Sequence, residues 1–243
     1  FEQAMDEYAT NYLIKGAASD GFNPRFVRDF MPRHVWRGSQ VPGAQMGGDN
    51  PDNCYRLAGI AHGESYVIRG RAVGVAPPNV SFTLVGNWGT SVTIGTIENH
   101  QLDFASDGSF EMTIGPAEGG ANHLQTASHV KFLFVRDSLN DWATEQPYQL
   151  EIERIGGASR PALSVAEMAE RACHRMVEDV PLYYWFSRLW MGLPPNEMRA
   201  PRRSGAVGGL VTQAASSGVF RLAEDEAATI TFGAAGAAYA GIV

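Results

Sequence analysis

The spacing of hydrophobic positions changes twice along the chain. Over residues 1–15 apolar side chains recur at helical spacing, and acidic residues occupy the other faces. From Asn53 onward the pattern changes to short β-rich runs separated by turn residues. After Gly156 the helical spacing returns. The pattern therefore predicts a helical N-terminal segment, a β-rich middle and a second helical segment.

Seven strands are predicted in the β-rich middle, with no helix between them. They cover residues 54–60, 65–75, 79–87, 91–98, 109–114, 130–136 and 148–155. Consecutive strands without crossover helices favour an antiparallel β-sandwich or jelly roll over a parallel sheet. The run Phe132 to Val135 is apolar throughout, which predicts a central strand covered on both faces.

The segment between the first helix and the sandwich carries weaker signals. Asn23 and Pro24 form a typical helix start, so a short helix is predicted over residues 24–30. Residues 33–48 lack periodicity and are expected to form an extended connection.

The C-terminal part is predicted to begin a further unit. Residues 194–217 are rich in Pro, Gly, Ala and Ser, which is typical of a loop or interdomain crossing. Apolar runs at 219–222 and 227–232 predict strands of a second β unit that is incomplete at Val243. Because the chain also starts at Phe1 without Met, we expect the natural protein to be longer at both ends.

The helical segment after the sandwich is predicted to have two parts. Ser164 and Glu167 form a capping box, and Pro181 is expected to end or kink the first helix and to open a second one. The second part, residues 182–191, contains five aromatic residues and leaves no wide polar face. Three interpretations stay open: burial of Trp185 and its neighbours against a sheet, a lid over an apolar ligand, or contact with a partner or membrane surface.

Together these signals predict a mainly β protein with added helices. The core is expected to be an antiparallel β-sandwich with jelly-roll character. The predicted segments are a helical N-terminal segment and connection at 1–46, the β-sandwich domain at 47–157, a helical segment at 158–204 and the start of a second, incomplete β unit at 205–243.

Charge and composition narrow the class of partner. The chain carries 26 acidic and 19 basic residues, a net charge of -7, and clustered cations occur only at Arg199, Arg202 and Arg203. Binding to nucleic acid requires many clustered cations, so no nucleic-acid partner is expected. The sequence contains no run of about 18 apolar residues, so no transmembrane segment is expected. We expect a cytoplasmic protein, with a removed signal peptide as the alternative.

The usual signatures of catalytic and cofactor sites are missing from the sequence. Cys54 and Cys173 are expected to be buried free thiols, with a disulfide as the alternative. There is no CxxC pair, HExxH, GxSxG or phosphate-binding loop, and the six histidines are scattered. No metal and no cofactor are therefore expected, although three histidines converging in a jelly roll of the cupin type are the less favoured alternative.

The segment Gly47 to Ile60, GGDNPDNCYRLAGI, combines turn formers, polar side chains and the start of a strand. Its Asn-Pro-Asp-Asn element predicts a rigid turn, because Asn and Asp side chains hydrogen-bond their own backbone and Pro fixes one dihedral angle. The alternative is a ligand site at the mouth of the sandwich. The side chains that would form this site are Asp49, Asn50, Asp52, Asn53, Tyr55 and Arg56.

A second polar cluster follows the apolar run of the sixth predicted strand. Its members are Arg136, Asp137, Asn140, Asp141, Trp142 and Glu145. An Arg among three carboxylates usually belongs to a structural ion-pair network that secures a loop. If this cluster lies beside the first one, the two would supply an acid/base pair, but no spacing in the sequence shows that they meet.

The stretches GGDNPDNCYR, DGSFEMTIGP and FVRDSLNDWATEQPYQLEIERI carry a family resemblance. Together they resemble bacterial proteins grouped under domains of unknown function 1214 and 1254. The resemblance covers residues 47–155, with a weaker similarity in the last thirty residues. It implies an all-β core of jelly-roll character with added helices, and it implies no common activity.

Two functional hypotheses follow from these signals. The first is a pocket that joins the 50–56 turn to the 182–191 helix and binds or transforms a small ligand with polar and apolar parts, such as a lipid, a steroid-like compound or a glycan. The candidate ligand-binding residues are Asp49, Asn50, Asp52, Asn53, Tyr55, Arg56, Arg136, Asp137, Trp142, Trp185 and Trp190. The second is a non-catalytic interaction or assembly module, in which the 182–191 helix contacts another subunit of a homo-oligomer.

Overall fold

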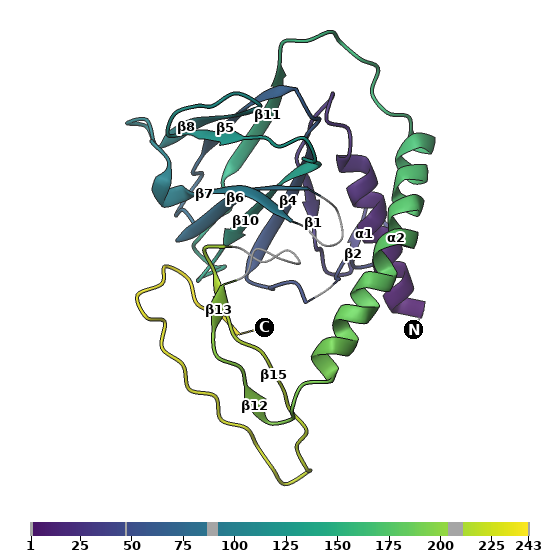
Figure 1. The fold of residues 1–243 in the computed structure, drawn as a ribbon, viewed down its shortest axis with the longest axis vertical. Helices are drawn as coiled ribbons and strands as arrows, with labels where there is room; N and C mark the ends of the chain where they lie inside the picture. Colours follow the sequence, from purple (N-terminus) through teal and green to yellow (C-terminus); the bar gives the residue numbers. More distant parts are fainter. Residues whose placement is uncertain (1, 47, 87–91, 204–210, 243) are drawn as a thin grey trace.

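Two β-sheets face each other, and two helices lie side by side on one flank of this sandwich (Figure 1). The structure is a computed structural model that describes residues 2–46, 48–86, 92–203 and 211–242. The expectation of a mainly β fold with added helices is confirmed.

The first sheet has five antiparallel strands, in the order β1 (Val27–Asp29), β4 (Asn53–Gly59), β10 (Phe132–Ser138), β6 (Asn79–Val85) and β7 (Thr93–Glu98). The second has four strands, in the order β11 (Gln149–Ile155), β5 (Ser65–Arg71), β8 (Ser109–Gly115) and β9 (His123–Gln125). Only the β8–β9 pair among these described strands is parallel. A 3-10 turn, η1 (Asn99–Gln101), follows β7.

The main hydrophobic core lies between the two sheets. Alternate residues of β6, β10, β5 and β8 point into it, including the fully buried Phe82, Leu133 and Met112. Every residue of β10 is buried, because this strand is central in its sheet and is covered on both faces. The prediction of a central, doubly covered strand at Phe132 to Val135 is therefore confirmed.

The outer face of the five-stranded sheet is covered by α1 (Glu2–Ala18), and α2 (Val165–Met191) packs on α1 (Figure 1). Ala18 of α1 joins a cluster formed by side chains of β4 and β10, including Leu57 and Phe132. Gly16 allows the two helices to approach closely, since an added Cβ there would lie 2.4 Å from the Met168 carbonyl oxygen.

The segment before the sandwich differs from its prediction. The helix expected over residues 24–30 is wrong: Val27–Asp29 form the edge strand β1, which pairs antiparallel with β4. Pairing with β4 satisfies backbone groups that a lone short helix would leave to solvent, and it overrides the local helix-start signal. The extended connection contains a small hairpin, β2 (His34–Trp36) and β3 (Ser39–Val41).

The helix does not end at Pro181, because α2 runs from Val165 to Met191 with Pro181 in its interior. Pro in a helix interior removes one backbone hydrogen bond and costs about 3 kcal/mol. Here Val180 and Tyr183, on either side of Pro181, both pack into the cluster between α1 and α2. This packing holds the helix together across the proline. The predicted capping box at Ser164 and Glu167 is confirmed at the start of the helix.

The described residues 192–203 and 211–242 form an extended C-terminal arm with little regular structure. Its strands have two residues each and pair β12 (Glu197–Met198) with β15 (Gly218–Val219), and β13 (Arg202–Arg203) with β14 (Ala214–Ala215). The run 227–232, predicted as a strand, is not one. The glycine-rich stretch 204–210 lies outside the described residues. Within the described chain, neither helix combines the length and hydrophobicity that crossing a bilayer requires.

Candidate functional site

The Asn50–Asn53 segment forms the rigid turn that the sequence favoured. Asn50 Oδ1 accepts a hydrogen bond from the Asp52 amide at 2.9 Å. The hydroxyl of Tyr55 accepts hydrogen bonds from the Asn50 amide at 2.8 Å and from Asn53 Nδ2 at 3.0 Å. These polar groups therefore bond to one another and fix the entry to β4.

The outer side of the same turn holds the C-terminal arm. The Tyr239 hydroxyl donates to Asp52 Oδ2 at 2.8 Å and accepts from Asn50 Nδ2 at 2.8 Å. One residue away, Asn140 Nδ2 donates to the Ala238 carbonyl at 3.3 Å. In this structure the turn thus serves as an anchor for the arm.

The two polar clusters of the sequence do meet, because β4 and β10 are paired. Asp137 lies opposite Cys54 in the ladder, and its carboxylate forms an ion pair with Arg56. Arg56 Nη1 also donates to the Tyr148 carbonyl at 2.6 Å, and Asp137 Oδ1 accepts from the Tyr148 amide at 3.1 Å. Burial raises the pKa of Asp137, and the Arg56 guanidinium opposes this shift. The pair clamps the start of β11 to the first sheet, which is a structural role.

Arg136 lies against aromatic side chains of the first sheet. Its guanidinium lies 4.5 Å from the Phe134 ring centroid and 6.0 Å from that of Tyr55. Burial lowers the pKa of Arg136 to about 10. Asp141 and Glu145 instead accept hydrogen bonds from their own loop, and Trp142 in that loop is half exposed.

A second group of polar side chains lies between α1, α2 and β1, and we call it the interhelical polar cluster. Its members are Asn11, Tyr12 and Lys15 from α1, Asp29 from β1, and Asp179 and Tyr183 from α2. Asn11 Nδ2 donates to Asp29 Oδ1 at 2.7 Å and to the Ala44 carbonyl at 3.0 Å. Lys15 Nζ lies 5.1 Å from the Tyr12 ring centroid and 5.7 Å from that of Phe30.

Burial shifts the pKa of every ionisable side chain in the interhelical polar cluster. It lowers the pKa of Lys15, and the Asp29 and Asp179 carboxylates oppose that shift. It raises the pKa of Asp29 to about 6 and also raises the pKa of Asp179. The positive charge of Lys15 acts in the opposite direction and lowers both pKa values. The pKa values of Tyr12 and Tyr183 are raised by burial and by the Asp179 carboxylate.

Two oxygen atoms of the interhelical polar cluster, Asn11 Oδ1 and Asp29 Oδ2, are buried and have no hydrogen-bond partner among the described residues. Tyr12 Oη and Asp179 Oδ2 are buried as well, and these two side chains interact with each other. Lys15 likewise forms no ion pair within 4.0 Å in the described chain. Buried groups of this kind normally bind water, an ion or a ligand.

The aromatic part of α2 does not pack against a sheet, so the expected burial of Trp185 and Trp190 is wrong. The inner face of the helix is formed by Ala172, Met176, Asp179, Val180 and Tyr183, and it is already occupied by α1 and the Phe30 loop. The outward side carries apolar residues instead. Val177, Trp185 and Leu189 expose 76%, 66% and 68% of their surface.

These outward residues share one face of the helix. Val177, Pro181, Trp185 and Leu189 follow one another at intervals of four, with Leu182 and Tyr184 beside them. Residues spaced by four are neighbours on a helix surface, so the six form a continuous band about 18 Å long. We call this band the α2 stripe.

Neither of the two hollows described in the structure is lined by residues of the expected pocket between the 50–56 turn and the aromatic helix. Tyr55 packs on Phe30, with ring centroids 4.7 Å apart, and Phe30 also contacts the cluster that includes Tyr183. The two segments are therefore connected through Phe30, on the inner side of α2. Trp185 and Trp190 are exposed, and Trp142 belongs to the loop after β10.

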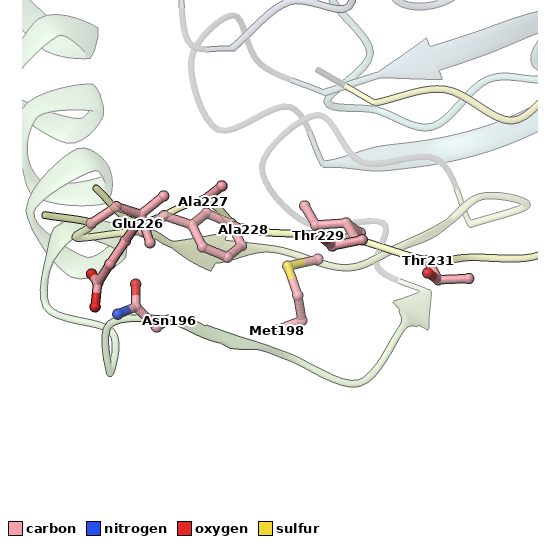
Figure 2. Close-up of a pocket in the computed structure, with 10 residues that line it drawn as sticks. Asn196, Met198, Glu226, Ala227, Ala228, Thr229 and Thr231 are labelled. Carbon is pink, nitrogen blue, oxygen red and sulfur yellow. The ribbon is translucent and has the colours of Figure 1, made fainter. Parts of the chain in front are cut away.

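One hollow lies in the C-terminal arm and has a volume of about 700 Å³ (Figure 2). Figure 2 shows Asn196, Met198 and Glu226 among the residues that line it. Its walls are extended arm segments whose residues are almost all exposed. None of the predicted ligand-binding residues lines it.

Two further expectations concern cysteines and metals. Both cysteines are free, as predicted, but only Cys54 is buried, whereas Cys173 lies exposed on α2. Cys54 is covered within β4, and burial raises the pKa of its thiol. In the described part of the chain, no three His, Cys, Asp or Glu side chains gather closely enough to hold a metal ion.

Sequence reasoning missed Lys15, Asp29 and Asp179. A charged residue in an amphipathic pattern is normally assigned to the solvent-facing side of its helix. Lys15 was at the expected end of the first helix, and Asp29 was placed in a helix that does not form. One signal was present: Lys15 is one of only two lysines in the chain.

Comparison with known proteins supports the fold and adds no activity. No family model and no curated protein matches the chain. Among solved structures, an uncharacterised protein from Burkholderia cenocepacia aligns with a TM-score of 0.65 and 26% identity, over 85% of this chain and 58% of that one. The chain thus spans less than two thirds of that neighbour.

A second solved structure, the VPA0106 protein from Vibrio parahaemolyticus, aligns with a TM-score of 0.33 and 18% identity, over 43% of this chain and 31% of that one. This likeness is too low to carry an argument. The resemblance to domains of unknown function 1214 and 1254 stays a prediction.

Proposed function

We propose that this protein is an interaction and assembly module whose contact surface is the α2 stripe. The observation that carries the proposal is the exposure of Val177, Trp185 and Leu189 on one helix face. Large apolar side chains that gather on one surface mark interaction sites more often than isolated ones do. Tryptophan is also among the residues that contribute most to binding energy at protein interfaces.

The packing of α2 suits this role. Its inner face is fixed on α1 by the interhelical polar cluster and by Met176 and Val180. The stripe is therefore presented on a helix whose rotation about its own axis is set by buried contacts. Such preorganisation lowers the entropy that binding has to overcome.

The direct test is sedimentation velocity on the full chain and on Trp185→Ser. The unmodified protein is expected to associate in the micromolar range, and Trp185→Ser to weaken this association about tenfold or more. Trp142→Ser is the matched control, because Trp142 is also about half exposed but lies on the sandwich. Equal association of all three proteins, or none in any of them, would contradict the proposal.

A second candidate function rests on a separate observation, the unpartnered atoms of the interhelical polar cluster. Lys15, Asp29 and Asp179 supply charges, while Met46 and Met176 supply apolar contacts beside them. A cluster of this composition suits a small ligand with polar and apolar parts. This proposal keeps the ligand class expected from the sequence and moves the site to other residues.

Native mass spectrometry of the purified full chain tests this candidate. A bound small molecule is expected as a mass adduct that Lys15→Met and Asp179→Asn both lose, while Lys131→Met keeps it. Lys131 is the other lysine and is exposed. An adduct that persists in both cluster variants, or its absence from the unmodified protein, would rule the candidate out.

A further inference from the structure

The α2 stripe is nearly symmetric about position 183. Counting outward from Tyr183, Leu182 matches Tyr184, Pro181 matches Trp185, and Val177 matches Leu189. Each apolar position on one side thus has an apolar position at the same distance on the other. If two copies of α2 lie antiparallel with their centres at Tyr183, every apolar residue of the stripe lies at the same level as an apolar residue of the partner.

The charged residues on the same face follow the same symmetry with opposite signs. Glu178 and Arg188 both lie five residues from Tyr183, so an antiparallel partner would place each Glu178 opposite an Arg188. Within the described chain the Arg188 side chain has no ion-pair partner. Glu178 accepts from Arg175 at 2.9 Å and lies 3.4 Å from His174, and it keeps exposed surface for a further cation.

A parallel arrangement would have the opposite effect. It would place Glu178 beside Glu178 and Arg188 beside Arg188, and like charges in contact oppose association. Two-fold symmetry in the antiparallel arrangement makes each contact occur twice from a single surface. The pattern of charge therefore selects both the partner and its direction.

We infer that the occupant of the α2 stripe is a second copy of this chain, docked antiparallel about a two-fold axis that crosses the outward face of α2 at the level of Tyr183. This inference rests on the proposed assembly function and specifies its partner and geometry. Trp185 of each copy lies over Pro181 of the other, and two Glu178–Arg188 ion pairs flank the apolar centre. The interface consists of the two outward helix faces, while the inner faces stay packed on α1.

The distance between the two Cys173 residues of the dimer tests this arrangement. Cys173 is exposed and Cys54 is buried, so a nitroxide reagent labels Cys173 selectively, which peptide mass analysis verifies. In the antiparallel dimer the two Cys173 residues are separated by 20 positions along the helix direction, or about 30 Å at 1.5 Å per residue. In a parallel dimer they lie at the same level, about 10 Å apart. Pulsed electron paramagnetic resonance separates the two distances.

Charge reversal provides the second arm of the test. Glu178→Arg and Arg188→Glu are each expected to weaken the dimer about tenfold, since each creates two like-charge contacts, and the double variant is expected to recover within about threefold of the unmodified chain. Glu178→Gln is the control for the lost contacts with His174 and Arg175, and it should have a smaller effect.

The outcomes distinguish failure of the antiparallel geometry from failure of the proposed assembly function. A distance near 30 Å with recovery in the double variant supports the antiparallel dimer. A dimer that depends on Trp185 but shows a distance near 10 Å, or no recovery, overturns the geometry and leaves the assembly function standing. A chain that stays monomeric overturns both.

Discussion

Gly16 of α1 lies directly against the backbone of Met168 in α2, where an added Cβ would come within 2.4 Å of the carbonyl oxygen. The same Cβ would lie 3.1 Å from the Cβ of Ala172. The close approach of the two helices at this point therefore depends on a residue without a side chain. Because α1 sits on the sheet, this contact also sets the position of α2 and of its outward stripe.

Substitution of Gly16 by Ala should therefore loosen the packing of α2 on α1. The backbone of Met168 has to move away, and overpacking of this kind costs about 1–3 kcal/mol of unfolding free energy. Gly120→Ala is the matched control, because an added Cβ there meets nothing within 4 Å. Urea unfolding measures both, and a stability for Gly16→Ala equal to that of the control would show that the contact is not tight.

The reactivity of the two lysines should differ strongly in the folded chain. Lys15 is buried between α1, β1 and α2, whereas Lys131 is exposed immediately before β10. Acetylation of Lys15 requires local opening of the helix pair, so its rate should be at least about 100-fold lower than that of Lys131. Peptide mass spectrometry measures both rates in one sample. Denaturant should make the rates similar, and similar rates without denaturant would contradict the burial of Lys15.

Asp29 should give the stability a characteristic dependence on pH. Burial raises its pKa from 3.8 to about 6, so between these values the folded state binds more protons than the unfolded state. Stability from this group therefore rises as pH falls through about 6 and levels off below about 4. The full gain is on the order of 3 kcal/mol, because the shift of about two pKa units corresponds to about 1.4 kcal/mol per unit.

Asp29→Asn removes this titration while keeping the size of the side chain. The unfolding free energy of the unmodified chain, relative to Asp29→Asn, should increase between pH 7 and pH 4.5. Denaturant unfolding at the two pH values measures the difference, in which the carboxylates common to both proteins largely cancel. A constant or opposite difference would mean that Asp29 is not buried as an ionisable group.

The buried Arg56–Asp137 ion pair should matter far more to stability than an exposed one. Arg56→Met leaves the fully buried Asp137 carboxylate without its cation, which typically costs about 3–5 kcal/mol. Arg69→Met is the matched control: Arg69 pairs with Glu111 at 3.1 Å and with Glu153 at 3.0 Å on an exposed sheet face, and its loss should have a much smaller effect on stability. Thermal unfolding measures both variants. If Arg56→Met and Arg69→Met lowered the stability by similar amounts, Arg56 would not clamp β11 to the first sheet.

The β-sandwich could be predicted from the sequence because strand signals are local. All seven predicted strands have counterparts, since turn residues and apolar runs mark them directly, and Phe132 to Val135 even revealed the central strand. The edge strand β1 and the short β9 were missed. Each of them has only three residues, which is too short for a recognisable alternation of apolar and polar positions. Each forms only because it pairs with a strand that is distant in the sequence.

The candidate site was less accessible to sequence reasoning. The 182–191 helix was identified as unusual from its aromatic residues, but which of them face outward depends on where α1 binds, and Gly16 gives no sign of that contact. Lys15, Asp29 and Asp179 come from three separate segments and meet only in the folded chain. The Asn50–Arg56 segment, by contrast, was recognised as a rigid turn because its bonds are local.

The central claim is that the α2 stripe is covered by a second copy of the chain, and the molar mass in solution tests it most directly. Sedimentation equilibrium of the unmodified chain over about 1–100 µM should show a mass that rises with concentration from that of the 26.3 kDa monomer toward twice that value. A mass of 26.3 kDa at every concentration would contradict the account.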